Sequence, residues 1–397
     1  MNDINFNKYD FVIVGSGFAG SCVANILSEY DYKILIVEKR DHIAGNAYDY
    51  MIDDIYIHKY GPHLFHTNHK EVYDYLSKFT DWYEYKHQVL GKVLDKLIPI
   101  PFNLNSIIQI YDKASANILI DKLILKYGKN NKVSILKLMQ DEDQDISTLA
   151  NFVYEHIFKY YTMKQWGLTV DQIDKSVLER VPIVLNYQNG YFDDIYQCMP
   201  KNGYTNLFNN MLNNDNIDIL LNKDIKDYIS FNNKDILFDN ILYQGKVIYT
   251  GEIDYLFDYQ YNKLPYRSLD LKLHKEKGIY QQAPTINYPL PKETIPYTRI
   301  SEYKLFMDNY DKDTNTYFHV EYPLEYNKDA LLGNIPYYPI INDNNIKCYN
   351  RYLKYASKYC NLYLLGRLAQ YQYYNMDKII LEAINFTNKL LKELKNE

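Results

Sequence analysis

The sequence predicts an α/β protein in which a discontinuous Rossmann-type domain carries an inserted helical lobe and an antiparallel β-sheet domain. Three observations lead to this prediction. A strand, a glycine turn and a helix follow one another near the N-terminus, residues 103–166 show helical periodicity, and residues 265–340 are rich in β-branched and aromatic side chains. A chain of 397 residues is also too long to fold around one ordinary hydrophobic core, so two or three lobes are expected.

Residues 10–46 have the pattern of a dinucleotide-binding unit. A short apolar strand ends at Val14 and runs into the turn Gly15-Ser16-Gly17-Phe18-Ala19-Gly20, which opens an amphipathic helix. The first glycine permits the tight turn, the second lets the backbone approach a pyrophosphate, and the third lets the helix pack on its strand. A second strand ends at Glu38, where a carboxylate can accept hydrogen bonds from a ribose. The alternative, a tight turn without a ligand, does not explain the acidic residue.

The residues after Glu38 favour FAD as the dinucleotide. The segment Lys39-Arg40-Asp41-His42-Ile43-Ala44-Gly45-Asn46 resembles the extension of FAD proteins of the amine oxidase type. In those proteins an arginine and a pair of glycines approach the flavin, and Ala44 stands where the first of these glycines is usual. We therefore expect the Rossmann-type domain to bind FAD.

The remaining elements follow from local patterns. An irregular loop over residues 57–67 leads into a helix from Asn68, and residues 83–98 alternate as strands that Pro99 and Pro101 end. Residues 167–180 form a loop and a short helix, residues 217–250 are strand-rich, and a strand over 362–366 precedes a helix of roughly twenty residues that starts near Met376. The predicted domains are an FAD-binding domain (1–80, 196–258 and 345–397), a helical lobe with a mobile substrate lid (103–180) and an antiparallel sheet domain (81–102, 181–195 and 259–344).

Composition excludes several classes of partner. The 44 Lys and Arg residues against 50 Asp and Glu give a net charge of −6, so neither nucleic acid nor an anionic membrane is attracted in general. No apolar run approaches the ~18 residues of a membrane span, and the N-terminus lacks the features of a signal peptide. The four cysteines are scattered without metal-like spacing. We expect a cytoplasmic protein with reduced cysteines and no metal.

Two arginines have neighbours that suggest anion binding. Arg180 lies before Pro182, and Arg299 lies in the segment Pro296-Tyr297-Thr298-Arg299. A guanidinium group binds a diphosphate through bidentate hydrogen bonds, although a single arginine more often forms a surface salt bridge. The cluster Tyr161-Thr162-Met163-Lys164-Gln165-Trp166-Gly167 adds aromatic side chains suited to stacking on a nucleobase.

These segments together resemble the bacterial UDP-galactopyranose mutases along essentially the whole chain. The segments that carry the resemblance are 57–67, 161–167, 296–299, 336–339 and 366–369. The resemblance implies interconversion of UDP-galactopyranose and UDP-galactofuranose by ring contraction, for a galactofuranose-containing surface polysaccharide. It also implies that reduced FAD is required, with flavin N5 as the nucleophile on the anomeric carbon, and that the protein forms a homodimer.

The resemblance also implies roles for individual residues. Arg180 and Arg299 would clamp the diphosphate, with Arg180 on a lid that closes over the substrate, and His63 would lie beside the isoalloxazine. For His63 the alternative is a satisfied loop histidine. The implied substrate-binding residues are Tyr161, Thr162, Trp166, Tyr191, Arg267, Tyr338 and Tyr373. The implied cofactor-binding residues are Gly15, Gly17, Phe18, Gly20, Glu38, Lys39, Asn46, His63, Arg367, Tyr374 and Met376.

Two positions depart from the family pattern and leave the substrate open. Asn375 stands where the family usually has aspartate, and His87 stands where relatives carry asparagine. UDP-N-acetylgalactosamine is therefore an alternative to UDP-galactose. Two other readings are a flavin oxidase of the same nucleotide-binding fold and a non-catalytic flavoprotein that senses a UDP-sugar.

Overall fold

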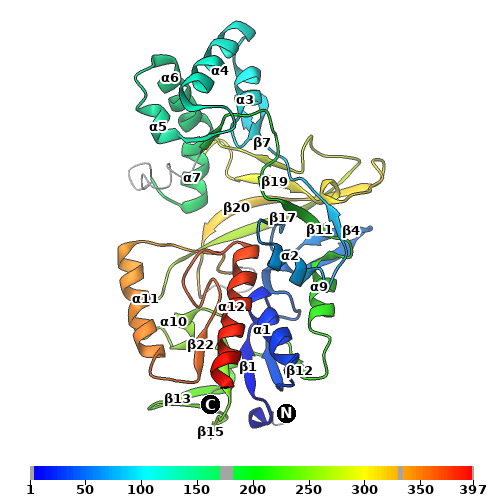
Figure 1. Ribbon diagram of the computed structural model, residues 1–397, viewed down its shortest axis with the longest axis vertical. Coiled ribbons are helices and arrows are strands. Elements are labelled where there is room, and N and C mark those ends of the chain that lie inside the picture. The colour runs from blue at the N-terminus through cyan, green and yellow to red at the C-terminus, as the bar shows by residue number, and fades with distance from the viewer. Residues whose placement is uncertain (1–3, 170–181, 330–333, 396–397) are drawn as a thin grey trace.

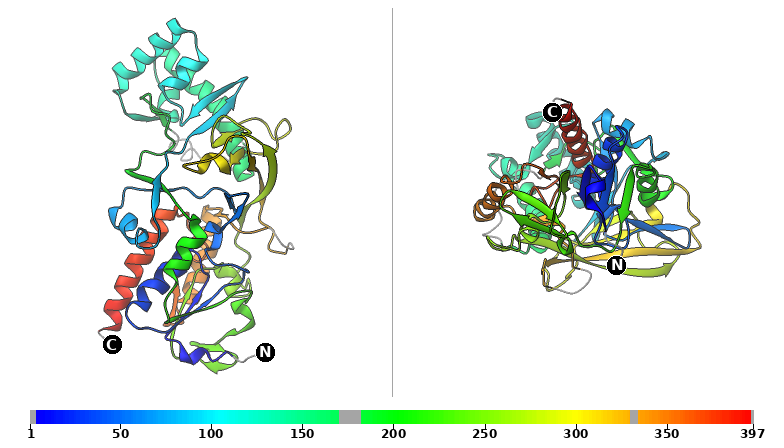
Figure 2. Two further views of the ribbon diagram at one scale, coloured as in Figure 1. Left: turned by 90° about the vertical axis from the view of Figure 1, so that its right-hand side faces the viewer. Right: turned by 90° about the horizontal axis from the view of Figure 1, so that it is seen from below.

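A computed structural model describes residues 4–169, 182–329 and 334–395, and its parts follow one another along the long axis (Figure 1). The helical lobe lies at one end, the largest sheet in the middle and the Rossmann-type domain at the other end. The left-hand view of Figure 2 shows the same succession from the side. Arg180 lies outside the described residues. Within the described residues, no helix is both long and apolar enough to cross a bilayer.

The Rossmann-type sheet has five parallel strands in the order β12-β2-β1-β16-β22. Their bounds are β12 (Ile217–Leu220), β2 (Ile34–Val37), β1 (Phe11–Val14), β16 (Lys246–Tyr249) and β22 (Leu362–Leu364). The strands come from three separated stretches of the chain, as the α/β prediction requires. Parallel sheets are covered on both faces, which is why the central strands β1 and β2 are continuous apolar runs.

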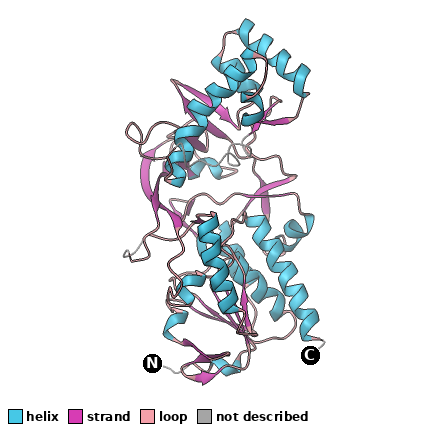
Figure 3. Cartoon of the chain, turned by 90° about the vertical axis from the view of Figure 1, so that its left-hand side faces the viewer, coloured by secondary structure: helices cyan, strands magenta, loops and turns pink. Residues whose placement is uncertain are grey.

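Alternate side chains of each strand enter two different cores. In β1, Phe11 and Ile13 pack under α1 (Phe18–Ser28) and α12 (Met376–Leu394), whereas Val12 packs into the opposite core. The first face is also covered by α2 (Lys70–Leu76) and α9 (Gly203–Met211), and the second by α10 (Ile253–Leu256) and α11 (Asp343–Ala356). Figure 3 shows helices flanking this sheet. The sequence pattern had indicated neither α9 nor α11.

The largest sheet has seven strands in the order β21-β17-β20-β19-β18-β7-β8. Their bounds are β21 (Tyr338–Pro339), β17 (Tyr266–Lys277), β20 (Asn315–Glu325), β19 (Arg299–Glu302), β18 (Thr285–Asn287), β7 (Val89–Val93) and β8 (Lys96–Ile100). All neighbours are antiparallel except β18 and β7. The predicted strand end at Pro99 is wrong, because β8 is an edge strand and such a strand tolerates proline.

The helical lobe contains α3 (Leu104–Ile110), α4 (Lys113–Tyr127), α5 (Ile135–Met139), α6 (Gln144–Val153), a π-helical turn (Tyr154–Phe158) and α7 (Lys159–Trp166). Asn103, Asp112 and Asp143 cap three of these helices by accepting backbone N–H bonds. A strand pair joins β9 (Lys132–Ser134) to β10 (Pro182–Val184), and Ile183 is buried in the lobe core. The predicted division had assigned β10 to the sheet domain, and that division stays a prediction.

Three small sheets complete the fold. A hairpin pairs β3 (Asp49–Ile52) with β4 (Ile55–His58). A second sheet places β11 (Tyr196–Pro200) between β5 (Phe65–Thr67) and β6 (Trp82–Glu84). A third contains β13 (Ile229–Asn232), β14 (Asp235–Phe238) and β15 (Ile241–Leu242). The first two lie beside the loop over residues 59–64, which borders the candidate site.

Candidate active site

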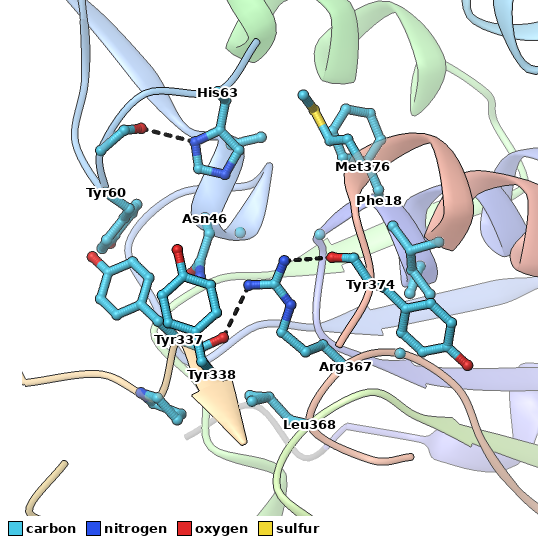
Figure 4. A pocket seen from close by; sticks show the side chains of 18 of the residues that line it. Phe18, Asn46, Tyr60, His63, Tyr337, Tyr338, Arg367, Leu368, Tyr374 and Met376 are labelled. Carbon is cyan, nitrogen blue, oxygen red and sulfur yellow. Dashed lines mark hydrogen bonds between the residues drawn. The ribbon is translucent and has the colours of Figure 1, made fainter. Parts of the chain in front are cut away.

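One large cleft, with a volume of about 490 Å³, lies between the carboxyl edge of the parallel sheet and the seven-stranded sheet. It is lined by the β1–α1 turn, the end of β2, the loop over 60–64, α7, β19 and the segments 336–338 and 366–376. Figure 4 shows the part of the cleft around His63 and Arg367. Ligands bind at this edge in open α/β sheets, because the loops after the strands converge there.

The glycine turn forms one end of the cleft. Gly15 has a φ of +98°, and a Cβ there would lie 2.2 Å from Thr250 Oγ1. Gly17 faces Gly45, and a Cβ added at Gly45 would lie 2.9 Å from the Gly17 Cα. Gly20 is not among the described residues that line the cleft, since it lies behind the turn, where a Cβ would meet the Gly15 carbonyl oxygen at 2.0 Å. The turn therefore leaves its backbone open to a ligand.

Glu38 and Arg40 present charged groups to the same end. Glu38 is buried, and its carboxylate accepts bonds from Ser16 N (2.9 Å), Ser16 Oγ (2.8 Å) and Arg40 N (3.0 Å). Arg40 Nη2 donates to Asn46 Oδ1 at 2.8 Å, and the guanidinium lies 4.4 Å from the ring centroid of Tyr60. Arg40 Nη1 is buried and has no hydrogen-bond partner among the described residues. An unpaired guanidinium donor beside a glycine turn fits the pyrophosphate of a dinucleotide.

His63 is held in the neutral form at the wall of the cleft. Its Nδ1 lies 2.8 Å from Gly61 O (Figure 4), so Nδ1 carries the proton. Its backbone N donates to His58 Nδ1 at 2.9 Å. Burial, together with the neighbouring His58, lowers the pKa of His63 to about 4. The imidazole thus keeps Nε2 as a hydrogen-bond acceptor at neutral pH.

Arg367 organises a tyrosine cluster on the opposite wall. Its guanidinium donates to Tyr337 O at 2.9 Å and to Tyr374 O at 2.6 Å (Figure 4). The same group lies 5.4 Å from the ring centroid of Tyr338 and 5.2 Å from that of Tyr373. These two rings stack with centroids 5.6 Å apart. Arg367 therefore joins the segment before β21 to the segment before α12.

Arg299 lines the cleft from the start of β19. Its Nε donates to Glu321 Oε2 at 2.8 Å, and its Nη2 forms an ion pair with the same oxygen at 2.8 Å. The Glu321 side chain is only 2% exposed. Tyr161 on α7 and Tyr191 line the same cleft. One predicted anion-binding arginine and two predicted tyrosines thus meet there with the glycine turn.

Most of the predicted site residues reach the cleft. Besides those described above, its lining includes Phe18, Lys39, Asn46, Tyr338, Tyr373, Tyr374 and Met376. Their individual roles stay predictions. Asn375 and His87, the two predicted departures from the family pattern, also line it.

Arg267, Trp166 and Thr162 are not among the described residues that line the cleft. Arg267 instead donates to Gln165 O at 2.9 Å and to Lys164 O at 3.3 Å, which fixes the end of α7. Trp166 lies at that same helix end, and its ring centroid is 6.4 Å from that of Tyr338. The expected contacts of these three side chains with substrate stay predictions.

Several residues that line the cleft were not among the predicted site residues. His66 Nδ1 lies 2.8 Å from Asp194 Oδ2, and its ring stacks on Phe192 at 3.7 Å. Tyr60 contacts Arg40, and its hydroxyl forms a hydrogen bond of 2.7 Å with His42 Nε2. Both His66 and Tyr60 lie in the segment 57–67. Because this segment carries the family resemblance, the sequence could have pointed to both residues. Among the described residues, no group of His, Cys, Asp or Glu side chains could hold a metal ion.

The fold and the cleft define a dinucleotide-binding α/β protein whose ligand site lies between two sheets. A family model for UDP-galactopyranose mutase matches residues 156–373, and one for an NAD(P)-binding Rossmann-like domain matches residues 13–79. The chain belongs to the UDP-galactopyranose mutase family, and this confirms the prediction of an isomerase.

Curated relatives match over nearly their full length. A UDP-galactopyranose mutase of Mycoplasma genitalium is 38% identical, with 98% of this chain and 96% of the relative covered. A probable UDP-galactopyranose mutase of Klebsiella pneumoniae is 32% identical, with 98% and 97% covered. A dTDP-fucopyranose mutase of Escherichia coli is 33% identical, with 97% and 99% covered.

Solved structures share the fold. A crystal structure of reduced UDP-galactopyranose mutase superposes with a TM-score of 0.70 at 16% identity, covering 97% of this chain and 94% of the other. A protein described as a protoporphyrinogen oxidase from Exiguobacterium superposes with a TM-score of 0.65 at 12% identity, covering 96% and 98%. Mutases and oxidases thus share this architecture, so the fold alone does not select the reaction.

Proposed function

We propose that this protein interconverts UDP-galactopyranose and UDP-galactofuranose with reduced FAD bound in the cleft. One observation carries the proposal: a single cleft contains both the glycine turn at Gly15 and the group formed by Arg299, Tyr161 and Tyr191. A dinucleotide at the turn and a nucleotide sugar at Arg299 would therefore bind side by side. The homodimer and the cytoplasmic location stay predictions.

The residues at the glycine turn fit FAD. The open backbone of Gly15 and Gly17, the buried Glu38 carboxylate and the unpaired Arg40 Nη1 would hold its ribose and pyrophosphate. When bound and reduced, FAD supplies a nucleophilic nitrogen for the anomeric carbon of the sugar. His63, neutral and with Nε2 available, would accept a hydrogen bond at this side of the cleft.

Arg299 would stabilise the negative charge that develops on UDP as the bond to the sugar breaks. Its guanidinium stays charged, and Glu321 fixes its orientation before substrate arrives. Such preorganised charge acts more strongly in a cleft than in water, because no reorganisation is needed during the reaction. Tyr161 would lie against the uracil ring. Arg180 would add a second guanidinium from the predicted lid.

A second candidate is a mutase for a different nucleotide sugar. The relative named a dTDP-fucopyranose mutase is as similar to this chain as the UDP-galactopyranose mutases are. Asn375 and His87 line the cleft and differ from the family pattern, so UDP-N-acetylgalactosamine and dTDP-fucose belong among the substrates to be compared.

The test is an isomerisation assay on the purified flavoprotein. UDP-galactofuranose is incubated with and without dithionite, and formation of the pyranose is followed by chromatography. The proposal expects conversion only when the flavin is reduced. Consumption of an electron acceptor would instead indicate an oxidase, and unchanged sugar under both conditions would indicate a binding protein. Parallel incubations with dTDP-fucofuranose and UDP-N-acetylgalactofuranosamine rank the sugars by kcat/KM.

A further inference from the structure

Lys164 is a buried lysine whose ammonium binds only backbone carbonyls among the described residues. It lies on α7 and is 6% exposed. Its Nζ donates to the carbonyl oxygens of Tyr288 (2.7 Å), Ile295 (3.0 Å) and Tyr297 (2.7 Å). An ammonium has three N–H groups, so these three bonds use them all. Burial lowers the pKa of Lys164 to about 8, because holding a charge away from water is costly.

The three carbonyls belong to the loop that ends at Arg299. This loop connects β18 to β19, and Tyr288 N closes it by donating to Thr298 O at 2.8 Å. Thr298 is in turn fixed to β20, since its backbone N donates to Glu321 O at 2.9 Å. The position of Arg299 therefore depends on a loop that Lys164 binds at both of its ends.

The other side of this connection is the helix that carries Tyr161. Lys164 follows Tyr161 by three residues, so both side chains leave α7 on nearby faces. Arg267 holds the same helix end from β17 by donating to the carbonyls of Lys164 and Gln165. Gly167 completes the helix end with a φ of +65°, where a Cβ would lie 2.6 Å from Arg267 Nη1. The end of α7 is thus fixed from two directions.

We propose that Lys164 is a positioning residue for the nucleotide part of the substrate. Its three bonds set the position of Tyr161 relative to Arg299, the two side chains that would contact uracil and diphosphate. The proposal rests on the proposed function, because it takes these two residues as the nucleotide site. An ammonium suits this task because it draws three carbonyls to one point, whereas an apolar side chain would leave them without donors.

A second buried lysine provides a matched control. Lys304 is 1% exposed, and its Nζ donates to Asp311 O (2.8 Å), Thr314 O (2.7 Å) and Thr314 Oγ1 (3.0 Å). It lies in the turn Tyr303–Phe306 directly after β19, and it is not among the described residues that line the cleft. Replacing either lysine by methionine removes a comparable set of buried hydrogen bonds. Of the two sets, the one made by Lys164 connects to the candidate site.

The experiment compares Lys164→Met and Lys304→Met in the FAD-loaded protein. The measurements are the Kd for UDP by calorimetry, KM and kcat for UDP-galactofuranose with dithionite, bound flavin by absorbance, and Tm. We expect Lys164→Met to raise Kd and KM about tenfold with flavin content unchanged. Lys304→Met should lower Tm similarly while Kd and KM stay within twofold of the wild type.

Lys164→Arg keeps a cationic donor. It tests the positioning role of Lys164 if Lys164→Met does not fold. This variant should show a rise in Kd of only about threefold, since a guanidinium can restore part of the carbonyl bonding. Unchanged Kd and KM in the Lys164 variants, or equal losses in Lys304→Met, would overturn the positioning role. A wild-type protein that binds no UDP would overturn the proposed function instead.

Discussion

Arg299 and Glu321 lie directly opposite each other on neighbouring strands β19 and β20. One Glu321 oxygen accepts a hydrogen bond of 2.8 Å from Arg299 Nε and forms an ion pair with Arg299 Nη2, also at 2.8 Å. The second Glu321 oxygen accepts from Thr298 Oγ1 at 3.2 Å. The carboxylate is buried, so it stays in one orientation and holds the guanidinium with it. This pairing orients the Arg299 guanidinium in the cleft before an anionic ligand binds.

The first prediction concerns Arg299 itself. Arg299→Ala should reduce kcat/KM by at least about a thousandfold, because the charge that stabilises departing UDP is lost and Glu321 is left unpaired. The protein should remain yellow with the flavin bound. Steady-state kinetics with dithionite and an absorbance spectrum measure both. Loss of flavin in this variant would mean that Arg299 has a structural role.

The second prediction concerns the glycine turn. Gly15→Ala should lower FAD affinity at least about tenfold, because an alanine at a φ of +98° is strained and its Cβ would meet Thr250 Oγ1. Gly278→Ala is the control, since Gly278 has a φ of +85° but its Cβ would meet only Lys312 O at 3.6 Å. The control should lose stability of about 1 kcal/mol and keep its flavin. Equal flavin loss in both variants would contradict the role given to Gly15.

The third prediction uses the unpaired donor of Arg40. Arg40→Gln should weaken FAD binding about tenfold or more, because the cationic side chain whose buried Nη1 is unpaired beside the cleft is then missing. Arg351→Gln is a matched control, as Arg351 also lies 4.4 Å from a tyrosine ring centroid, that of Tyr261, but away from the cleft. Titration of the apoprotein with FAD, followed by fluorescence, gives both affinities. Retained affinity in Arg40→Gln would mean that Nη1 does not face the cofactor.

The fourth prediction is an acid-sensitive stability. Burial lowers the pKa of His58 and His87 to about 3 and of His63 and His319 to about 4, below the ordinary 6.5. Below pH 6.5 the unfolded chain therefore binds more protons than the folded protein. The free energy of unfolding should be fully retained above pH 6.5 and fall as the pH drops toward 4, by at most about 1.4 kcal/mol per pH unit for each histidine.

One variant isolates a single histidine of this set. His319 bonds the Tyr303 hydroxyl at 2.6 Å and lies away from the cleft, so His319→Gln should make the pH dependence shallower by about one proton. The exposed His156 is the control, and His156→Gln should leave the slope unchanged. Urea unfolding at a series of pH values measures the slopes. Identical slopes in wild type and His319→Gln would refute the assignment.

The sequence was sufficient where a local pattern determines the structure. The turn at Gly15, the acidic end of β2 at Glu38 and the parallel strands all follow from short segments with a strong backbone or hydrophobic signal. The discontinuous sheet could be anticipated because the last strand and helix repeat the same strand–glycine–helix order.

The sequence was insufficient where the orientation of a side chain depends on tertiary packing. Trp166 follows Tyr161 by five residues, which turns it about 140° around α7, so the sequence motif alone does not fix the directions of both side chains. Arg267 was expected at the ligand, but the carbonyls at the end of α7 bind its guanidinium. Glu321 carried no signal at all, because only the register of β19 and β20 brings it to Arg299.

The most direct test of the central claim is a crystal structure with reduced FAD and UDP bound. We predict that the UDP diphosphate lies at hydrogen-bond distance, about 3 Å, from the Arg299 guanidinium, with uracil beside Tyr161 and the FAD pyrophosphate at the glycine turn. A diphosphate bound elsewhere, with Arg299 still bonded to Glu321 alone, would contradict the account.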